Sequence, residues 1–448
     1  MRHSSFPEGV TRETLLRWFR EGRARSREIF EIPDPSTYYT RPIRLRNPIV
    51  FYEGHLPAFT INTLVKLALK KPGIDDHYEV LFARGIDPDS PDAVREPGDV
   101  WPSRSAVQSY GAAADAIVER ILAEEVIEDD AVPQLRGAEA AIAILEHEQM
   151  HQETLLYMLH NMPYERKRSR APLGGPEAGS PRERVRDGDP SFARIPAGRA
   201  TLGAARDQIG FGWDNEFPLH RVDVDAFEIG RYNVTNAEFL EFVEAGGYRR
   251  PELWGNAWEW IASEGIRHPH FWLERDGEWF WRGMFDLIPL PPDWPVYVTC
   301  AEAEAYARWK GMRIPTEAEY HRAAFGTPSG EERLYPWGSE VPDASRGNFG
   351  FMQWDPLPVG SFPAGASAWG VHDLVGNGWE WTATPFGGFP GFEPMASYAN
   401  YSADFFDGQH YVLKGASPAT ARELVRRSFR NWFRPNYPYL YATFRLAR

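Results

Sequence analysis

The chain has little of what secreted, membrane-spanning and nucleic-acid-binding proteins need. Its one cysteine, Cys300, excludes an intramolecular disulfide framework. Residues 1–27 are polar and arginine-rich without an apolar segment of the secretory type, so we expect no signal peptide. There is no run of about 18 apolar residues that could span a membrane. The net charge of −14 argues against nucleic acid or an anionic membrane as the main partner. We therefore expect a cytoplasmic protein.

Residue patterns divide the chain into two parts. The first part has helical periodicity, and the second has short apolar and aromatic runs separated by Gly, Pro and Asn, with two further predicted helices at 236–245 and 301–310. We expect an α+β protein with a four-helix bundle at 1–165, a Pro-, Gly- and charge-rich linker at 166–190, and a second domain at 191–448. The predicted bundle helices are 12–30, 48–71, 103–125 and 137–162.

Two histidines, His147 and His151, lie four residues apart in the last predicted bundle helix. At 3.6 residues per turn they project from one face about one turn apart, so both could bind one metal ion. Apolar residues such as Ile144 and Met158 share that face, which predicts that the pair points into the bundle core. Metal binding is favoured over a pair satisfied by hydrogen bonds alone.

The same helix contains the H-E-x-x-H string of zinc proteases, in which the glutamate is the general base and a third ligand follows downstream. Here Thr154 and Tyr157 occupy the positions of glycine and histidine in the metzincin pattern. The Pro- and Gly-rich residues 166–190 predict no second helix that could supply a glutamate. The sequence therefore disfavours a protease.

His55 is the candidate third ligand. It lies between Phe51 and Phe59 on an apolar stripe, where a polar imidazole needs a partner. A metal held by the helical pair is one such partner, and a backbone carbonyl is the alternative. His77 and His160 are expected at the surface. Three imidazoles leave up to three metal positions open, which suits either catalytic Zn or non-haem Fe(II).

The second part carries a series of motifs in the order found in the formylglycine-generating-enzyme family, which it resembles. The resemblance implies a C-type-lectin-like fold in which most motif residues, including Trp379–Trp381, are scaffold. Copper in that family is held by a cysteine pair, and Lys414-Gly-Ala-Ser occupies the region here, so copper chemistry is excluded. The matching motifs are Ile195-Pro-Ala-Gly198, Asn233-Val-Thr-Asn236, Arg313-Ile-Pro-Thr-Glu317, Tyr335-Pro-Trp-Gly338, Leu374-Val-Gly-Asn-Gly-Trp379 and Phe429-Arg-Asn-Trp432.

In the first part, Gly54-His55 and His147-x3-His151-x-Glu153 resemble the DinB-like bundle. The combined architecture resembles the ergothioneine sulfoxide synthases (the EgtB family) and their OvoA and SenA relatives. This implies an Fe(II)- and O2-dependent enzyme that joins a thiol sulfur to imidazole carbon 2 of hercynine, giving a sulfoxide. His55, His147 and His151 are then the iron ligands, and we expect Glu153 to orient an imidazole N–H.

The same resemblance implies the catalytic and substrate residues. A tyrosine supplies a proton to the reactive oxygen in this family, and Tyr398 and Tyr401 lie in the matching segment. Asn431 matches a residue that contacts the betaine, and Trp432 offers a π face for its quaternary ammonium.

Two departures from the family pattern concern the thiol. Phe433 replaces the aspartate of enzymes that use gamma-glutamylcysteine, and Met150 replaces a glutamine that often precedes the second helical histidine. We therefore expect a different thiol pocket, with cysteine favoured over gamma-glutamylcysteine. Arg434 or Arg430 is available for the cysteine carboxylate.

Other functions are compatible with the same residues. Within the class, they are a selenoneine synthase using a selenosugar and an enzyme that takes unmethylated histidine. A DinB-like zinc thiol transferase needs the same three histidines but no O2. A non-catalytic ligand-binding protein would rely on the second domain. The sequence leaves the sulfur donor and the oligomeric state open.

Overall fold

The computed structural model describes residues 10–83, 101–174 and 191–448, which form two compact units. The first unit contains the described parts of Met1–Ala171 together with Arg206–Trp213 and Pro394–Tyr401, and the second contains Pro172–Ala205, Asp214–Glu393 and Ser402–Arg448. The two short segments were expected in the second domain. They belong to the helical unit because Phe211 and Tyr398 pack against its apolar core.

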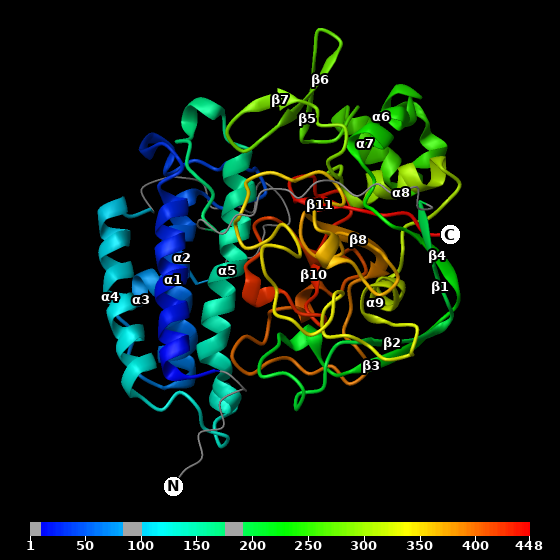
Figure 1. Cartoon of the computed structure of the whole chain (residues 1–448). Helices are drawn as coiled ribbons and strands as arrows, with labels where there is room; N and C mark the ends of the chain where they lie inside the picture. The colour runs from blue at the N-terminus through cyan, green and yellow to red at the C-terminus, as the bar shows by residue number, and fades with distance from the viewer. Residues whose placement is uncertain (1–9, 84–100, 175–190) are drawn as a thin grey trace. The chain divides into compact units, whose positions relative to one another are not determined.

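Four long helices run side by side in the first unit (Figure 1), where α1 contacts α4 and α5, and α2 contacts the same two helices. Thr11 and Ser103 cap the first turns of α1 and α4 with their hydroxyl groups. The predicted helix positions are confirmed to within a few residues, apart from the end of the second. The bounds are α1 Arg12–Phe30, α2 Ile49–Thr60, α4 Arg104–Glu124 and α5 Glu139–His160, with a short α3 at Asp76–Leu81.

The second predicted helix, 48–71, is α-helical only as far as Thr60. From Ile61–Ala68 its turns are π-helical, and the N–H of Leu69 bonds to the carbonyl of Leu64, five residues earlier, at 3.1 Å. Such wide turns are rare and occur frequently at functional sites. This one directly follows the α-helical turns that carry His55 and Phe59.

The beginning of the predicted linker, 166–190, is attached to the helical unit. The N–H of Asp34 donates to the carbonyl of Arg166 at 2.8 Å, and the Lys167 ammonium donates to the carbonyl of His160 at 3.1 Å. This return of the chain covers the end of α5. His160 is only 1% exposed, so its expected surface position was wrong, whereas His77 is exposed as expected. Residues 175–190 of the predicted linker lie outside the described residues.

The second unit consists of small sheets and short helices joined by long loops. Its largest sheet has the strand order β10-β9-β8-β11, in which β11 runs parallel to β8 and the other pairs are antiparallel. The bounds in that sheet are β8 Gly378–Pro385, β9 Tyr411–Ala416, β10 Asn431–Phe433 and β11 Ala442–Thr443. The other pairings are β1 Phe192–Ile195 with β4 Phe227–Gly230, β2 Gly198–Leu202 with β3 His220–Val224, and β5 Trp272–Arg275 with β6 Glu278–Arg282 and β7 Leu287–Pro289.

The helices predicted at 236–245 and 301–310 are α6 Asn236–Glu244 and α8 Cys300–Trp309. Two more helices, α7 Trp258–Glu264 and α9 Glu317–Phe325, were not predicted. Helix α9 nevertheless has a start signal in the sequence, since Thr316 and Glu319 cap it reciprocally. The expected combination of a helical region and a formylglycine-generating-enzyme-like α+β domain agrees with this architecture.

Tryptophan side chains fill the interior of the second unit. Trp379 and Trp381 are at most 2% exposed, and the indole N–H of Trp381 donates to the carbonyl of Val298 at 2.9 Å. Between them in sequence, Glu380 forms a buried ion pair with Arg445 through both carboxylate oxygens. A desolvated Trp N–H and a desolvated carboxylate each need such a partner. These motif residues are scaffold, as expected.

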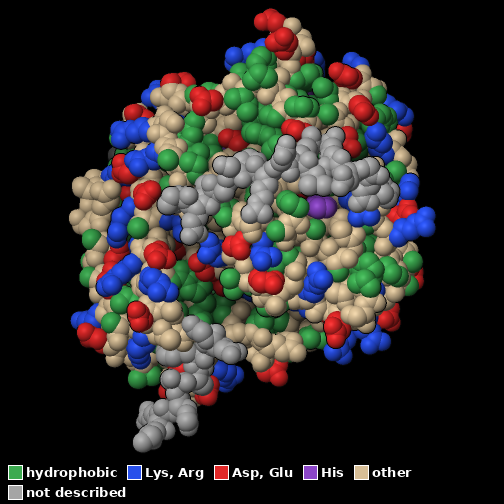
Figure 2. Space-filling view, in the orientation of Figure 1, with side chains coloured by type: hydrophobic (Ala, Val, Ile, Leu, Met, Phe, Trp, Pro, Cys, Tyr) green, Lys and Arg blue, Asp and Glu red, His purple; other side chains and the backbone are tan. Residues whose placement is uncertain are grey.

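The surface agrees with the modest excess of acidic residues. Figure 2 shows Lys and Arg side chains interspersed with Asp and Glu side chains over the described residues on the face drawn. Among the described helices, none combines the length and the apolar character needed to cross a bilayer.

Candidate metal centre

Three histidines converge in the helical unit. The Nε2 atom of His55, on α2, lies 3.3 Å from Nε2 of His147 and 3.2 Å from Nε2 of His151, both on α5. Imidazole nitrogens bound to one ion at about 2.1 Å lie about 3.0–3.4 Å apart for angles between 90° and the tetrahedral value. Within the described part of the chain this is the one cluster of His, Cys, Asp or Glu side chains that could hold a metal ion. The donor set fits a three-imidazole site.

The orientation of His55 is fixed by its neighbours. Its Nδ1 atom lies 2.8 Å from the carbonyl of Phe82, so Nδ1 carries the proton and the Nε2 lone pair faces the other two imidazoles. The ring of Phe51 stacks on the His55 ring, with centroids 5.1 Å apart. Gly54 makes room for Phe82, because a Cβ at that position would lie 2.5 Å from the Phe82 ring. A glycine beside the ligand thus allows the carbonyl contact.

The two helical histidines have different surroundings. The ring of Phe59 stacks on His147 with centroids 3.5 Å apart and 7° between the planes. His151 is partly exposed, yet its Nδ1 atom is buried and has no hydrogen-bond partner among the described residues. Glu153 is 9% exposed. It is not a partner of that nitrogen, and its expected contact with another imidazole stays a prediction.

Burial keeps all three imidazoles neutral. Loss of hydration lowers the pKa of His55 to about 4. The same loss of hydration, reinforced by neighbouring positive charge, holds the pKa of His147 and of His151 well below the usual range. A neutral imidazole has a lone pair available to a metal, so no proton has to leave before one binds at pH 7.

These pKa shifts predict how acid affects the metal-free protein. The unfolded chain protonates His55 near pH 6.5, whereas the folded protein does so only near pH 4, so stability is lost as the pH falls between those values. From pH 7 to pH 5 the loss from His55 should be about 2 kcal/mol. The free energy of unfolding of the metal-free protein, measured in urea by circular dichroism, should therefore depend more steeply on pH in the parent than in His55→Gln. Equal slopes would mean that folding does not lower the pKa of His55.

Glu148, the glutamate of the H-E-x-x-H string, points away from the histidines. Its carboxylate accepts a hydrogen bond from the Ser26 hydroxyl at 2.6 Å and pairs with the Arg23 guanidinium at 3.0 Å, both on α1. Burial raises the pKa of Glu148 despite these partners. A residue next to His147 in sequence is rotated about 100° around the helix. Glu148 therefore ties α5 to α1 and is not placed to activate a metal-bound water.

The candidate tyrosines lie in the same unit as the histidines. The Tyr398 ring is 5.2 Å from the Phe59 ring and 6.3 Å from the His147 ring, measured between centroids. The Tyr401 hydroxyl donates to the sulfur of Met150 at 3.2 Å. Both side chains are half-buried. The structure thus brings Tyr398, Tyr401 and Met150 together with the three histidines.

Sequence reasoning missed several residues that shape this centre. The Phe82 carbonyl has no side-chain signature. Trp213 stacks on Tyr401 with centroids 4.1 Å apart and donates its indole N–H to Glu146 at 2.8 Å. For the hydrogen bond between Trp213 and Glu146, the only signal in the sequence was Glu146 itself. A carboxylate on a mostly buried helix needs a hydrogen-bond donor.

The candidate substrate residues lie in the second unit. Asn431, Trp432 and Phe433 form β10, and Trp432 stacks on Phe386 with centroids 4.2 Å apart. Phe433 stacks on Tyr437 at 5.1 Å. These side chains are half-buried, as is that of Arg434.

Arg430, expected as one of two arginines for the thiol carboxylate, is engaged within the protein. It is 3% exposed and pairs with both carboxylate oxygens of Glu317, at 2.9 and 3.2 Å. It also donates hydrogen bonds to the carbonyls of Asn215 and Gly387 and lies over the rings of Phe386 and Phe389. Its guanidinium is thus occupied by packing contacts, which leaves Arg434 as the candidate.

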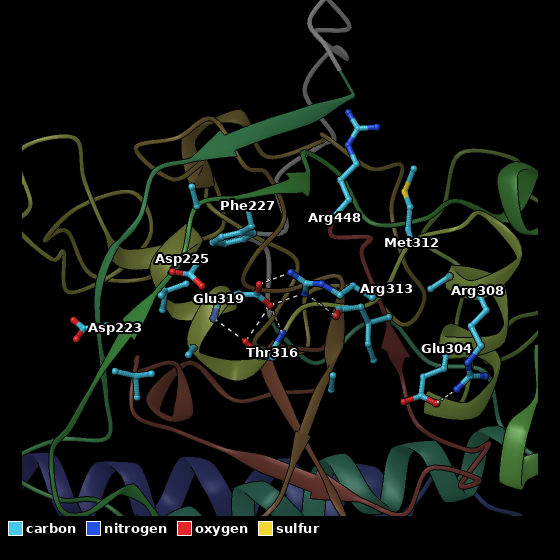
Figure 3. Close-up of a pocket in the computed structure, with 17 residues that line it drawn as sticks. Asp223, Asp225, Phe227, Glu304, Arg308, Met312, Arg313, Thr316, Glu319 and Arg448 are labelled. Atoms are coloured by element: carbon cyan, nitrogen blue, oxygen red, sulfur yellow. Dashed lines mark hydrogen bonds and ion pairs between the residues drawn. The ribbon is translucent and has the colours of Figure 1, made fainter.

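A hollow in the described part of the second unit has a volume of about 560 Å³ and is lined mainly by residues of β3, α8 and α9 and of the loops that follow β3 and α8. Figure 3 shows Arg313 directed at Glu319 and Arg308 directed at Glu304, each at 2.7 Å. Arg308 and Arg313 are thus paired with carboxylates of the same wall, and Arg448 is paired with Glu228 outside it. None of the candidate substrate residues lines it, so we place no substrate there.

Comparisons with known proteins identify the relatives of this chain. The family model of the sulfatase-modifying factor enzyme 1-like domain matches residues 177–448. Hercynine oxygenase of Mycolicibacterium thermoresistibile is 41% identical over 326 residues, which cover 71% of this chain and 70% of that protein. Hercynine oxygenase of Mycolicibacterium smegmatis is 40% identical over 68% of this chain and 70% of its own length. Ergothioneine biosynthesis protein 1 of Neurospora crassa is 30% identical over 91% of this chain, which spans 54% of that longer protein.

Proposed function

The chain belongs to the hercynine oxygenase family, and on this premise we propose that it is an Fe(II)- and O2-dependent sulfoxide synthase. It joins the sulfur of a thiol to imidazole carbon 2 of hercynine. The observation that carries the proposal is the convergence of three imidazoles: Nε2 of His55 lies 3.3 Å from Nε2 of His147 and 3.2 Å from Nε2 of His151. Three imidazole ligands leave metal positions for two substrates and O2, whereas a structural zinc site is closed by four protein ligands.

Each residue of the centre has a task in this chemistry. Bound iron supplies the redox centre at which the thiol, the imidazole and O2 react. His55, His147 and His151 hold it, and the Phe51 and Phe59 rings that stack on two of them limit access of water. We assign the proton that the oxygen requires to the phenol of Tyr398.

Substrate recognition is assigned to β10 and the residue that follows it. Trp432 offers an aromatic face to the trimethylammonium group of hercynine, and Asn431 a polar contact. Arg434 is assigned to the carboxylate of the thiol substrate, because a guanidinium binds a carboxylate through two parallel hydrogen bonds. Phe433, which stacks on Tyr437, stands here in place of the aspartate of enzymes that use gamma-glutamylcysteine, so this wall of the proposed thiol pocket is aromatic.

The expected donor preference follows from that aromatic wall. Without a carboxylate at position 433, nothing there pairs with the amino group of a gamma-glutamyl extension. We therefore expect a higher kcat/KM for cysteine than for gamma-glutamylcysteine, measured at saturating hercynine. Phe433→Asp should raise kcat/KM for gamma-glutamylcysteine relative to that for cysteine, and Phe433→Leu serves as its uncharged control. A parent enzyme that prefers the dipeptide would contradict the assignment.

The function itself is tested by metal reconstitution. Metal-free protein is loaded anaerobically with Fe(II) or with Zn(II), and O2 uptake is measured with hercynine and cysteine. The proposal predicts O2 uptake and sulfoxide only with iron, and only when both substrates are present. Thiol transfer with zinc and no O2 uptake would indicate a zinc transferase. Replacing hercynine by histidine, or cysteine by a selenosugar, tests the alternatives within the class.

A further inference from the structure

One face of α5 carries anchors for the tyrosine segment, 394–401. Counted from Glu139, Glu146 lies seven residues and Met150 eleven residues further along the chain. These spacings correspond to two and three helical turns. They therefore form a stripe along the helix. His147 and His151, each one residue further along, lie on the adjacent stripe.

The stripe contacts the tyrosine segment at two points, in its middle and at its last residue. Glu139 accepts two hydrogen bonds from Ser397, one from its backbone N–H at 2.9 Å and one from its hydroxyl at 2.7 Å. Met150 accepts a hydrogen bond from the Tyr401 hydroxyl at 3.2 Å. Tyr398 lies between these two attachment points in the sequence.

Glu146, in the middle of the stripe, acts on Tyr401 through Trp213. Glu146 is 3% exposed and accepts the indole N–H of Trp213, which is 1% exposed, at 2.8 Å. The Trp213 ring stacks on the Tyr401 ring with 28° between their planes. A carboxylate that accepts a hydrogen bond in a buried place fixes its donor strongly, because neither group has water as an alternative. Trp213 is thus a rigid support for Tyr401.

We propose that Glu139, Glu146 and Met150 are positioning residues that hold segment 394–401 along α5, so that Tyr398 rather than Tyr401 is presented to the three histidines. The proposal rests on the sulfoxide synthase function proposed above. The ring of Tyr398 contacts Phe59, which is itself stacked on His147. The Tyr401 hydroxyl is directed at a thioether and its ring is held by Trp213. The two tyrosines therefore have different roles, one as proton donor and one as anchor.

Paired variants separate positioning from mere packing. Gln at position 139 or 146 keeps an oxygen that accepts the same hydrogen bond, whereas Leu has a similar size and no acceptor. We expect Glu146→Leu and Glu139→Leu to lower the ratio of sulfoxide to sulfinic acid about 10-fold, and the Gln variants to restore most of it. Glu119→Leu, on the exposed side of α4 and paired there with Arg20, is the matched control and should leave the ratio unchanged.

A second measurement requires no catalysis. In the metal-free protein, hydrogen exchange followed by mass spectrometry should be about 10-fold faster in the peptide containing Ser397 when Glu139 is Leu, and unchanged when it is Gln. Iron content after anaerobic loading should equal that of the parent in all these variants, because the histidines are intact.

The outcomes distinguish this proposal from the proposed function. Unchanged exchange and an unchanged product ratio in both Leu variants would overturn the positioning role, as would faster exchange with an unchanged ratio. If a Leu variant fails to fold, Met150→Leu keeps a similar side-chain volume and removes the acceptor for Tyr401, and it should lower the ratio about threefold. A parent protein that makes no sulfoxide overturns the proposed function, and the exchange measurement alone then decides whether Glu139 anchors the segment.

Discussion

Replacing His147 with Ala should abolish stoichiometric Fe(II) binding and, with it, sulfoxide formation. Groups that only orient metal ligands contribute about 10–100-fold to affinity, so loss of one of three ligands should cost more than about 100-fold. The same result is expected for His55→Ala and His151→Ala, because the three Nε2 atoms share one site. Iron is quantified after anaerobic loading and desalting.

The matched control for these variants is His77→Ala, since His77 is an exposed histidine of the same unit. It should bind iron as the parent does. Full iron occupancy in His55→Ala would remove that residue from the ligand set. His160 would not then be an obvious substitute, because it lies near the end of α5, more than two turns from His151.

Replacing Tyr398 with Phe should lower the rate of sulfoxide formation by about 10²–10⁴-fold, the usual contribution of a general acid. Without its proton the thiol should be diverted to the sulfinic acid, so the product ratio should change as well as the rate. Tyr401→Phe should have a smaller effect, since it removes one hydrogen bond to Met150 and keeps the stacked ring. Mass spectrometry of both products under single-turnover conditions measures the two quantities.

The control for the tyrosine variants is Tyr39→Phe, because Tyr39 is 42% exposed on the bundle surface. If both Tyr398→Phe and Tyr401→Phe keep the parent rate and product ratio, neither is the acid. Tyr52 would be the next residue to test, since its ring centroid lies 5.8 Å from that of His151.

The sequence predicted features that depend on local spacing. The helical period placed α1, α4 and α5 within a few residues, and a four-residue spacing placed His147 and His151 on one face. His55 could also be predicted from its own helix, because a polar residue on an apolar stripe needs a partner. In each case the information lies within one helix.

Features that depend on residues distant in the sequence could not be predicted from local spacing. Segments 206–213 and 394–401 contain no signal that assigns them to the helical unit, since the aromatic residues that hold them there would suit either core. Arg430 and Arg434 also looked equivalent as candidate carboxylate ligands. They differ because Glu317, more than 100 residues away, occupies the guanidinium of Arg430.

The attachment of segment 394–401 to α5 also has a consequence during synthesis of the chain. Ser397 is 258 residues beyond Glu139, and Tyr401 is 251 residues beyond Met150. At about 5–20 residues per second, the ribosome adds the last of the three histidines roughly 10–50 s before it adds the two tyrosines. If iron bound during this interval, it would have the three proposed ligands and not yet the proposed proton donor. A nascent chain loaded early would combine a redox metal and O2 with no acid to direct the reaction, so loading after chain release gives the safer order of assembly.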